Sequence, residues 1–316
     1  MPSTLVIYNP VAGHGRVKSE WPQVEAALHN AGVDFDAVAT QAPLDAIFLA
    51  REAPQKYERV VSVGGDGTLH EIVNGLLRAS GENETIPIGI IPLGNGDDFA
   101  KDLPPKASIG GKCFDWRMSV EKIARGQTQS FDAGCMQADH IRPELEGDGV
   151  HYFIQAIAVG FVAQAAHNFS TIPKYLKGLT AYVAVTFKTL VEYPIPHLRI
   201  QVDDQLTFEQ SLTAALIGNC RCVANGFWFF PGAYPDDGLI DLMITDEISR
   251  LKIVQMLPKF MKSTHIGEEV IHMNQAQHIS FESQDPFLVE TDGEFPFLDT
   301  HRLEVDVLPK KVRIIV

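Results

Sequence analysis

Hydrophobic residues along the first third of the chain follow two alternating patterns. Short apolar runs bounded by turn residues are typical of buried strands, and apolar residues spaced three or four positions apart are typical of helices. These patterns predict strands at 4–8, 34–40, 59–63 and 86–92, and helices at 20–32, 44–53 and 69–77. Because strands and helices alternate, the sequence predicts a parallel, doubly wound α/β sheet.

Beyond about residue 130 the apolar segments read mainly as strands, separated by turn sequences such as "VDDQ" and "PDDG". This pattern of short strands separated by turns is typical of a β-sandwich. Strands are predicted at 151–161, 197–204, 211–220, 239–245, 278–283 and 287–294, with inserted helices around 174–191 and 249–261. The closing "HRLEVDVLPKKVRIIV" contains two more strand-like runs. We therefore expect an α/β domain at 1–130 and a mainly-β domain at 131–302.

The charge balance narrows the choice of partners. Aspartate and glutamate total 40 against 26 lysines and arginines, which gives the 316 residues a formal net charge of −14. A surface this acidic repels nucleic-acid backbones and gains nothing overall from anionic lipid headgroups. A local basic region around a phosphate site is still compatible with this charge. We expect no nucleic-acid partner.

Cysteine usage and hydropathy indicate a cytoplasmic protein. The four cysteines are Cys113, Cys135, Cys220 and Cys222, and a spacing of two places the last pair on opposite faces of a strand. We expect reduced thiols and no zinc site. The N-terminal sequence lacks the features of a signal peptide, and no apolar run approaches the roughly 18 residues of a membrane-spanning helix.

A glycine-rich turn follows the third predicted strand. In "VVSVGGDGTLHEIVNGL" (60–76), Gly64, Gly65 and Gly67 surround Asp66 just before a helix begins. Such a turn lets backbone N–H groups approach phosphate, and the helix N-terminus favours an anion. Asp66 fits beside phosphate if a divalent cation lies between them. The alternative is a tight turn in which Asp66 caps the helix.

Two further loops strengthen the first interpretation. "IPIGIIPLGNGDDFAK" (86–101) is another apolar strand that ends in glycines and aspartates, and "NPVAG" (9–13) follows the first strand. The carboxyl ends of parallel strands line one crevice, where open α/β sheets bind ligands. The three loops together predict a single metal–phosphate site.

The motifs in this order resemble the diacylglycerol kinase catalytic-domain family, and in particular its soluble bacterial lipid-kinase branch. They are "NPVAG", "GGDGT" (64–68), "PLGNGDDFA" (92–100), "PDDGLIDLMI" (235–244) and "TDGE" (291–294), and the resemblance runs from residue 4 to the end. It implies an N-terminal α/β domain like those of phosphofructokinases and NAD kinases, and a C-terminal β-sandwich. It also implies a nucleotide between them, and a last strand, at about 303–316, that returns to the first domain.

The resemblance also assigns roles to residues. Asp66 and Asp98 would organise Mg²⁺, the phosphates and the acceptor hydroxyl, Glu294 would be the base, and Asp132 would lie near the same cleft. The residues implied to hold ATP are Asn9, Pro10, Val11, Ala12, Gly13, Thr40, Gly64, Gly65, Asp66, Gly67, Thr68 and Asn95.

Two C-terminal motifs have a second interpretation each. A carboxylate in "TDGE" could accept the proton of a lipid hydroxyl, but Asp-Gly is also a common hairpin turn. In "AYPDDGLIDL" (233–242), Asp237 could hold a structural Mg²⁺ together with backbone carbonyls. The resemblance places the Tyr234 and Leu239 carbonyls beside it, and the alternative is an acidic β-turn.

The sequence departs from the family pattern at three positions. Asn95 stands where the family usually has threonine, Asp97 where it has asparagine, and Val162 where an acidic residue is frequent. Asn95 keeps a hydrogen-bonding group. Asp97 adds a negative charge beside Asp98, which weakens phosphate binding unless a metal offsets it. Asp66, Asp98 and Glu294 are all retained.

The function indicated is an ATP- and Mg²⁺-dependent lipid kinase that phosphorylates a hydroxyl of a lipid such as diacylglycerol, with a role in phospholipid biosynthesis. The alternatives are a kinase of a soluble substrate, such as NAD or a sugar phosphate, and a nucleotide-binding regulator without turnover. The lipid would be presented at a membrane, and "STIPKYLKGLTAYVAVTF" (170–187), with Lys174 and Lys177, could make transient contact there. That segment could equally be a helix packed on its own sandwich, and the sequence leaves open whether the chain forms a homodimer.

Overall fold

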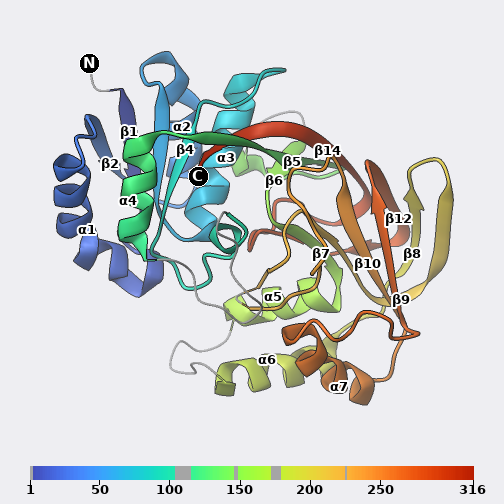
Figure 1. The fold of residues 1–316 in the computed structure, drawn as a ribbon. Coiled ribbons are helices and arrows are strands. Elements are labelled where there is room, and N and C mark those ends of the chain that lie inside the picture. The colour runs from blue at the N-terminus through green and yellow to red at the C-terminus, as the bar shows by residue number, and fades with distance from the viewer. Residues whose placement is uncertain (1–2, 104–114, 146–148, 172–178, 225) are drawn as a thin grey trace.

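The computed structural model describes residues 3–103, 115–145, 149–171, 179–224 and 226–316. Figure 1 shows two halves side by side, with helices around a sheet in the N-terminal half and twisted sheets in the C-terminal half. Three 3₁₀ turns are described: η1 (Ala53–Gln55), η2 (Phe99–Lys101) and η3 (Pro143–Leu145).

The N-terminal half contains a parallel sheet with helices on both faces. Its strands follow the order β2 (Phe35–Ala39), β1 (Thr4–Tyr8), β3 (Arg59–Gly64) and β4 (Ile88–Pro92). One face packs against α2 (Asp45–Glu52) and α3 (Asp66–Ser80), and the other packs against α1 (Ala12–Asn30) and α4 (Trp116–Arg125). Alternate strand residues supply the two cores, and the predicted doubly wound fold is confirmed.

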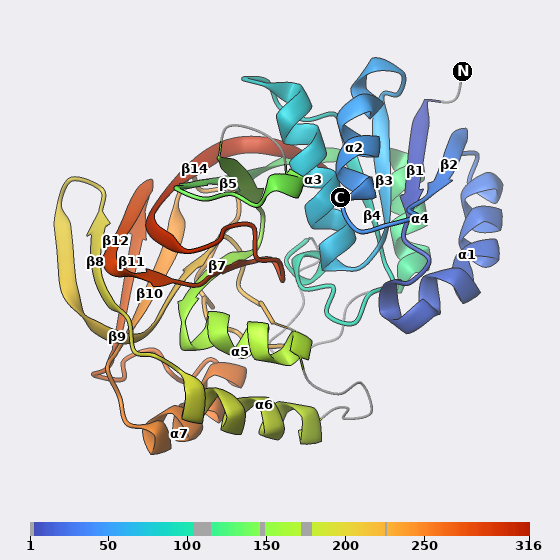
Figure 2. The ribbon, with the colours of Figure 1, turned by 180° about the vertical axis from the view of Figure 1, so that it is seen from behind.

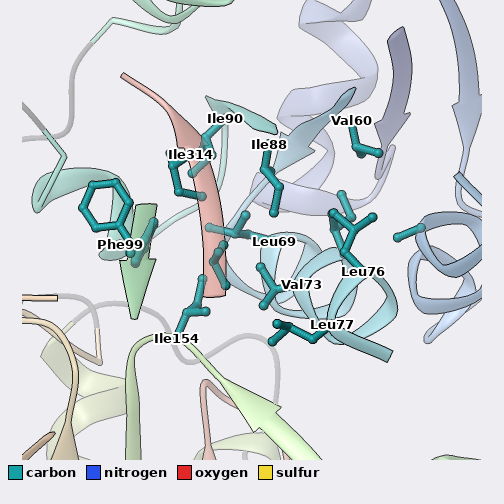
Figure 3. Close-up of a cluster of buried hydrophobic side chains, with 14 of the residues drawn as sticks. Val60, Leu69, Val73, Leu76, Leu77, Ile88, Ile90, Phe99, Ile154 and Ile314 are labelled. Atoms are coloured by element: carbon teal, nitrogen blue, oxygen red, sulfur yellow. The ribbon is translucent and has the colours of Figure 1, made fainter. Parts of the chain in front are cut away.

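Helix α3 begins and ends where its sequence dictates. Gly65 precedes it in an extended conformation, and Asp66 carries negative charge in the first turn, where the helix dipole favours it. Leu69, Ile72 and the following apolar residues at helical spacing are buried against the sheet; several are labelled in Figure 3. The helix stops at Gly81, whose φ of +56° suits glycine.

The C-terminal half is a β-sandwich, as expected. The first sheet contains β6 (Val150–Phe153), β5 (Thr128–Ala138), β14 (Thr300–Ile315), β12 (His278–Phe287), β8 (His197–Val202) and the start of β9 (Leu206–Gly218). The second contains β13 (Val289–Thr291), β7 (Ala156–Gly160), the rest of β9, β10 (Ile240–Asp246) and β11 (Ile271–Ala276). Buried aliphatic and aromatic residues of both sheets form the core between them.

Three helices lie together on one side of the sandwich (Figures 1 and 2). Helices α5 (Phe161–Thr171) and α7 (Arg250–Met261) contribute Ala163 and Met256 to a cluster on the outer face of the second sheet. Helix α6 (Leu179–Glu192) packs on α5, where the Asn168 Nδ2 donates to the Thr189 Oγ1 at 3.0 Å. Within the described residues, no helix is long and apolar enough to cross a membrane.

Strand β14 connects the two halves. It pairs antiparallel with β12 and β5, and its end pairs parallel with β4 through Ile314 and Ile88. The two strand-like runs at the end of the sequence are one strand, interrupted by a register shift between Leu308 and Val312 where Lys310 has a φ of +54°. The domain boundaries at 130 and 302 stay predictions.

The predicted strand at 151–161 is wrong in detail. It is divided into β6 and β7 because the backbone N–H groups of residues 154–156 bind the Asp292 carboxylate instead of a neighbouring strand. Helix α5 then starts at Phe161, directly after Gly160, which has a φ of +85°. The sequence patterns also missed α4, β5 and β11.

Candidate active site

The strand register brings the sequence motifs to one edge of the parallel sheet. Tyr8 is paired with Ala39 on one side and with Val63 on the other, and Gly64 is paired with Pro92. The loops that follow β1, β2, β3 and β4 therefore start side by side. This edge is where an open α/β sheet binds ligands.

The glycine loops after β3 and β4 are packed backbone against backbone. A Cβ on Gly94 would lie 2.4 Å from the Gly65 Cα, and one on Gly64 would lie 2.4 Å from the Thr68 Oγ1. The Leu93 N–H donates to the Gly64 carbonyl at 2.7 Å. Neither loop has room for a side chain at these positions, so both require glycine.

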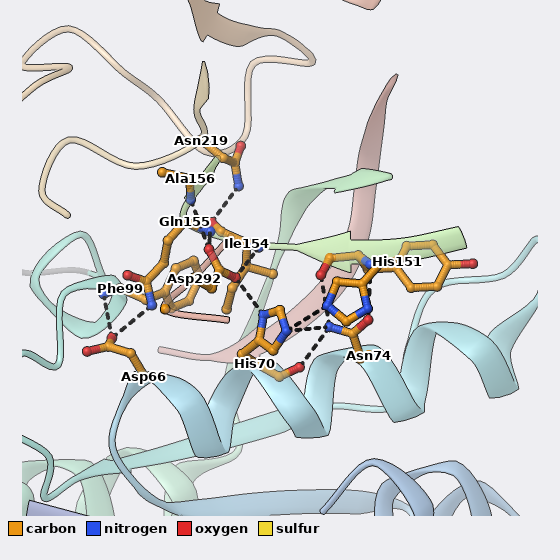
Figure 4. Close-up of polar contacts among 12 residues, drawn as sticks. Asp66, His70, Asn74, Phe99, His151, Ile154, Gln155, Ala156, Asn219 and Asp292 are labelled. Atoms are coloured by element: carbon orange, nitrogen blue, oxygen red, sulfur yellow. Dashed lines mark hydrogen bonds and ion pairs between the residues drawn. The ribbon is translucent and has the colours of Figure 1, made fainter. Parts of the chain in front are cut away.

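Asp66 lies at the N-terminus of α3 and is held from two directions. Its Oδ1 accepts hydrogen bonds from the Asp98 N–H at 2.8 Å and from the Gln155 Nε2 at 2.9 Å; Figure 4 shows it facing the Phe99 N–H and Gln155. Burial, followed by the charges of Asp98 and Asp97, raises the pKa of Asp66 to about 7. A nearby cation would favour the ionised form.

Asp98 is buried and paired with a lysine that the sequence patterns missed. The Lys101 Nζ lies 2.6 Å from the Asp98 Oδ1, and the Cys222 Sγ donates to the same oxygen at 3.4 Å. Burial opposes protonation of Lys101, but Asp98 outweighs it and raises the lysine pKa. The spacing of three residues in "DDFAK" was the only local signal for this pair.

The two departures in this loop have different surroundings. Asp97 has a φ of +52°, which aspartate and asparagine tolerate, and its Oδ1 accepts the Gly94 N–H at 2.9 Å. An asparagine oxygen could accept the same hydrogen bond. Aspartate at this position therefore preserves the contact that closes the loop from Gly94 to Asp97. Burial raises the pKa of Asp97 to about 6. Asn95 is exposed, with its Nδ2 3.4 Å from the His14 Nε2.

The carboxylates of Asp66 and Asp98 converge on the space beside Gly96. A Cβ at Gly96 would lie 2.9 Å from the Asp66 Oδ2 and 3.4 Å from the Asp98 Oδ2. Hard cations such as Mg²⁺ bind carboxylate oxygens and keep several waters. The donor set therefore fits Mg²⁺, although no three described Asp, Glu, His or Cys residues cluster as a complete set of metal ligands.

The predicted nucleotide loop lies beside the glycine turn. The Asn9 Nδ2 donates to the Thr68 Oγ1 at 3.2 Å, and the Asn9 Oδ1 accepts the Val11 N–H. Gly13 has a φ of +60°, and a Cβ there would lie 2.3 Å from the Leu93 carbonyl oxygen. Val11 is 77% exposed.

The other predicted nucleotide residues occupy the same edge. The Thr40 N–H binds the Tyr8 carbonyl at 3.0 Å, which places Thr40 at the end of β2. Pro10 and Ala12 are half-buried, and Gly67 is exposed.

The "TDGE" motif forms a tight turn at the end of β13. Thr291 and Glu294 exchange two backbone hydrogen bonds, of 2.9 and 2.7 Å. Asp292 and Gly293 have φ values of +47° and +93°, as a type I′ turn requires. The hairpin interpretation therefore describes the backbone, and it leaves the Glu294 side chain exposed.

Asp292 was not predicted as a functional residue, yet it is the most constrained member of this turn. Its carboxylate is buried and accepts hydrogen bonds from the backbone N–H groups of Ile154, Gln155 and Ala156 at 2.9–3.0 Å. Its Oδ2 also lies 2.9 Å from the His70 Nδ1. Figure 4 shows these contacts together.

Glu290 adds a second carboxylate beside the turn. Its Oε1 accepts the Gly293 N–H at 2.6 Å, and burial, followed by the Asp292 charge, raises its pKa to about 7. Nothing in the sequence distinguished this acid from an ordinary strand residue.

The predicted structural Mg²⁺ site lies on the loop before β10. Asp237 is exposed and its Oδ1 accepts the Leu239 N–H at 3.0 Å, while Tyr234 is exposed. Burial, followed by the charges of Asp132 and Asp236, raises the pKa of Asp237. A metal role for this loop stays a prediction.

Asp132 is buried, and its side chain binds backbone N–H groups. Its two carboxylate oxygens accept the Gly238 and Lys310 N–H groups, each at 2.7 Å. It therefore joins the loop before β10 to the bend in β14. The described cysteines Cys135, Cys220 and Cys222 form no disulfide with one another, and Cys113 lies outside the described residues.

The site combines two glycine-rich loops at the carboxyl edge of a parallel sheet with the carboxylates of Asp66 and Asp98. The β-sandwich adds the Thr291–Glu294 turn. This combination is typical of kinases built from an α/β half and a β-sandwich half. Residues 3–136 match the family model described as the diacylglycerol kinase catalytic domain, and residues 155–316 match the "YegS C-terminal NAD kinase beta sandwich-like domain". The chain belongs to the diacylglycerol kinase catalytic-domain family and is a kinase phosphotransferase.

The chain is similar in sequence to proteins named diacylglycerol kinase, and solved structures share its fold. A diacylglycerol kinase of Staphylococcus saprophyticus is 27% identical over 291 residues, covering 92% of this chain and 88% of the relative, and one of Staphylococcus haemolyticus is 28% identical, covering 92% and 81%. A crystal structure of a diacylglycerol kinase from Bacillus anthracis superposes with a TM-score of 0.69 at 19% identity, covering 99% of this chain and 96% of that one. Yeast NADH kinase shares the fold with a TM-score of 0.52 at 10% identity, covering 100% and 84%.

Proposed function

We propose that this kinase transfers the γ-phosphate of ATP, with Mg²⁺, to a hydroxyl of a lipid such as diacylglycerol. The observation that carries the proposal is that Gln155 joins the two acidic parts of the site. Its side chain binds Asp66 on the nucleotide side, and its backbone N–H binds Asp292 in the turn that contains Glu294. Gln155 therefore connects the acid assigned to the metal with the turn that bears the exposed Glu294 side chain.

The nucleotide would bind along the sheet edge. The N–H groups of the glycine turn at Gly64–Thr68 and the N-terminus of α3 offer donors to phosphate oxygens. The Asn9–Gly13 loop and Asn95 border this region, and Thr40 lies at the end of the neighbouring strand. Every nucleotide residue implied by the family resemblance lies on one of these four loops.

Asp66 and Asp98 would hold Mg²⁺ beside Gly96. When bound, the ion supplies neutralising charge between the carboxylates and the phosphates. The Lys101 Nζ binds the Asp98 Oδ1, whereas the Asp98 Oδ2 is the oxygen that lies beside Gly96.

Glu294 would act on the acceptor. As the lipid hydroxyl oxygen attacks the γ-phosphorus, the bond from that phosphorus to the β-phosphate oxygen breaks and ADP leaves. The hydroxyl proton passes to the Glu294 carboxylate. An exposed side chain directly after a tight turn suits this role because the acid must reach a substrate that enters from solvent.

The lipid would be presented by a membrane on the side of the sandwich that bears α6 and α7. Phe187 is 70% exposed and Leu251 is 68% exposed, and Val191, Val254 and Met261 are also exposed. Segment 250–262 contains four basic residues and no acid in a chain of net charge −14. A basic helix with an exposed apolar face suits an anionic lipid surface. Lys174 and Lys177, the residues considered from sequence, lie outside the described residues.

The test is transfer of ³²P from labelled ATP, with Mg²⁺, to a panel of acceptors. Diacylglycerol and other lipids would be presented in mixed micelles, with NAD and sugar phosphates offered in solution. Label in a lipid supports the proposal and begins to identify the substrate. Label only in a soluble acceptor, or tight ATP binding without any transfer, would overturn it.

A further inference from the structure

The turn that carries Glu294 is fixed through Asp292 rather than through Glu294 itself. Asp292 and Glu294 are separated only by Gly293, and two backbone hydrogen bonds between Thr291 and Glu294 close the turn. The Asp292 side chain is directed inward and is fully buried. Whatever holds this carboxylate therefore sets the position of Glu294.

Three of the four groups that bind Asp292 belong to one segment. They are the backbone N–H groups of residues 154–156, between β6 and β7. The fourth is the ring of His70, which belongs to the other half of the molecule. His70 lies one helical turn beyond Asp66 on α3, so both residues occupy the same face of one rigid helix.

His70 is itself held on its far side. Its Nε2 lies 2.9 Å from the Nε2 of His151 on β6, and both rings are buried. The Asn74 Nδ2 donates to the Tyr152 carbonyl at 2.8 Å and to the His70 carbonyl at 3.1 Å, which joins the same helix to β6. Figure 4 shows a continuous line of contacts from Asp292 through His70 to His151.

The charges around the two rings indicate one arrangement of protons. Burial opposes protonation of His70, but Asp292, with smaller contributions from Glu294 and Glu71, raises its pKa. Burial, followed by the charges of His70 and Arg78, lowers the pKa of His151 well below its usual value. A charged His70 can then donate from Nδ1 to Asp292 and from Nε2 to a neutral His151.

We propose that His70 is a positioning residue for phosphoryl transfer: by binding Asp292 it holds the Thr291–Glu294 turn against α3, and so fixes Glu294 relative to Asp66. The inference rests on the kinase activity proposed above. It assigns to His70 a role that requires no contact with substrate. The contact crosses 222 positions of sequence, from the nucleotide helix to the acid turn.

The contact between His70 and Asp292 depends on pH. Because the pKa of His70 is raised, the ion pair is complete below the ordinary histidine pKa and is lost as the pH rises through the raised value. The acidic groups near His70 are Asp292, Glu294, Glu290 and Glu71. On the opposite side His151 stays neutral. We therefore expect turnover to fall on the alkaline side as His70 loses its proton.

The experiment compares His70→Ala and His70→Asn with the wild-type protein, using kcat, the KM for ATP and the pH profile of kcat. Alanine removes the donor, and kcat should fall about 10–100-fold with the KM for ATP nearly unchanged, because misplacement of about 1 Å can cost that much. Asparagine keeps a donor near the Nδ1 position but does not titrate, so it should recover turnover and remove the alkaline decline. His265→Asn is the control, because His265 is also fully buried but binds the Phe229 carbonyl, between β9 and β10.

Each outcome decides between the possibilities. Unchanged kcat in His70→Ala, or an alkaline decline in His70→Asn that matches the wild type, overturns the inference while the kinase activity stands. If the alanine variant does not fold, the asparagine profile still decides, together with an NMR titration of the wild-type His70 ring, which must follow the decline in kcat. Absence of transfer by the wild type overturns the proposed function and this inference with it.

Discussion

Substitution of Asp292 by asparagine should destabilise the protein more than any other change of similar size in the turn. The Asp292 carboxylate accepts four hydrogen bonds, from the N–H groups of Ile154, Gln155 and Ala156 and from the His70 ring. Asparagine has almost the same shape and tolerates a positive φ, so the turn backbone is not strained by the change. The effect therefore comes from the loss of the charge and of one acceptor oxygen, without strain in the backbone.

The magnitude follows from which oxygen is replaced. The asparagine Oδ1 can still accept the Gln155 and Ala156 N–H groups, but its NH₂ then faces the Ile154 N–H and His70. A buried donor without an acceptor costs about 1–3 kcal/mol, and breaking a buried ion pair costs about 3–5 kcal/mol. Both losses occur at Oδ2 and overlap, so we expect about 3–5 kcal/mol in total.

Urea unfolding at pH 6.5 and the melting temperature would measure the loss. A change of this size should lower Tm by about 6–20 °C. Asp299→Asn is a matched control, because Asp299 has the same φ of +47° but is exposed. The control should stay within about 0.5 kcal/mol of the wild type.

The difference between wild type and Asp292→Asn should also depend on pH. Asp292 raises the pKa of His70 despite the opposing effect of burial. The ion pair therefore contributes fully below the unfolded histidine pKa of about 6.5, and this contribution disappears as the pH rises through the higher folded value. A difference below about 1 kcal/mol at pH 6.5, or one that grows with pH, would refute the reasoning.

Four further predictions concern the site and the membrane face. Glu294→Gln should leave ATP affinity nearly intact and lower kcat by about 10²–10⁴-fold, measured by phosphate transfer; full activity would remove Glu294 from the mechanism. Asp66→Asn should weaken Mg²⁺-dependent ATP binding in calorimetry, and an unchanged affinity would contradict its metal role. Lys101→Met should lower the free energy of unfolding by about 3–5 kcal/mol, because a buried carboxylate loses its partner; a stable variant would show that this pairing is dispensable. Leu251→Glu should reduce sedimentation with anionic vesicles and spare turnover on a short-chain lipid in solution, whereas the exposed control Leu206→Glu should bind vesicles normally.

The fold could be predicted largely from periodicity, where one face of a regular element is buried. Helix α3 and strands β1, β3 and β4 are apolar at the spacing their burial requires, and their bounds were predicted within about three residues. Strand β5 and helix α5 were missed for physical reasons. β5 mixes buried and half-exposed positions along its length, and α5 begins with apolar residues that directly continue the apolar run of β7, so the change from strand to helix is not marked.

The site could be predicted only where its chemistry is local in sequence. The glycine turns and their aspartates are contiguous motifs, because the backbone itself must bend there. The contact of Gln155 with Asp66 joins residues 89 positions apart, and that of His70 with Asp292 joins residues 222 apart. No spacing rule connects such pairs. In "TDGE" the sequence indicated Glu294 as the functional acid. In the structure it is Asp292 that makes the buried hydrogen bonds of this turn.

The position of residue 155 explains how acids from distant parts of the chain can share one site. Its segment leaves the sheet between β6 and β7, and this break exposes three consecutive N–H groups that need an acceptor. Asp292 supplies that acceptor, and the Gln155 side chain, projecting from the same break, reaches Asp66. The strand predicted at 151–161 is interrupted at residues 154–156. This interruption is therefore the feature that holds the Thr291–Glu294 turn and helix α3 together.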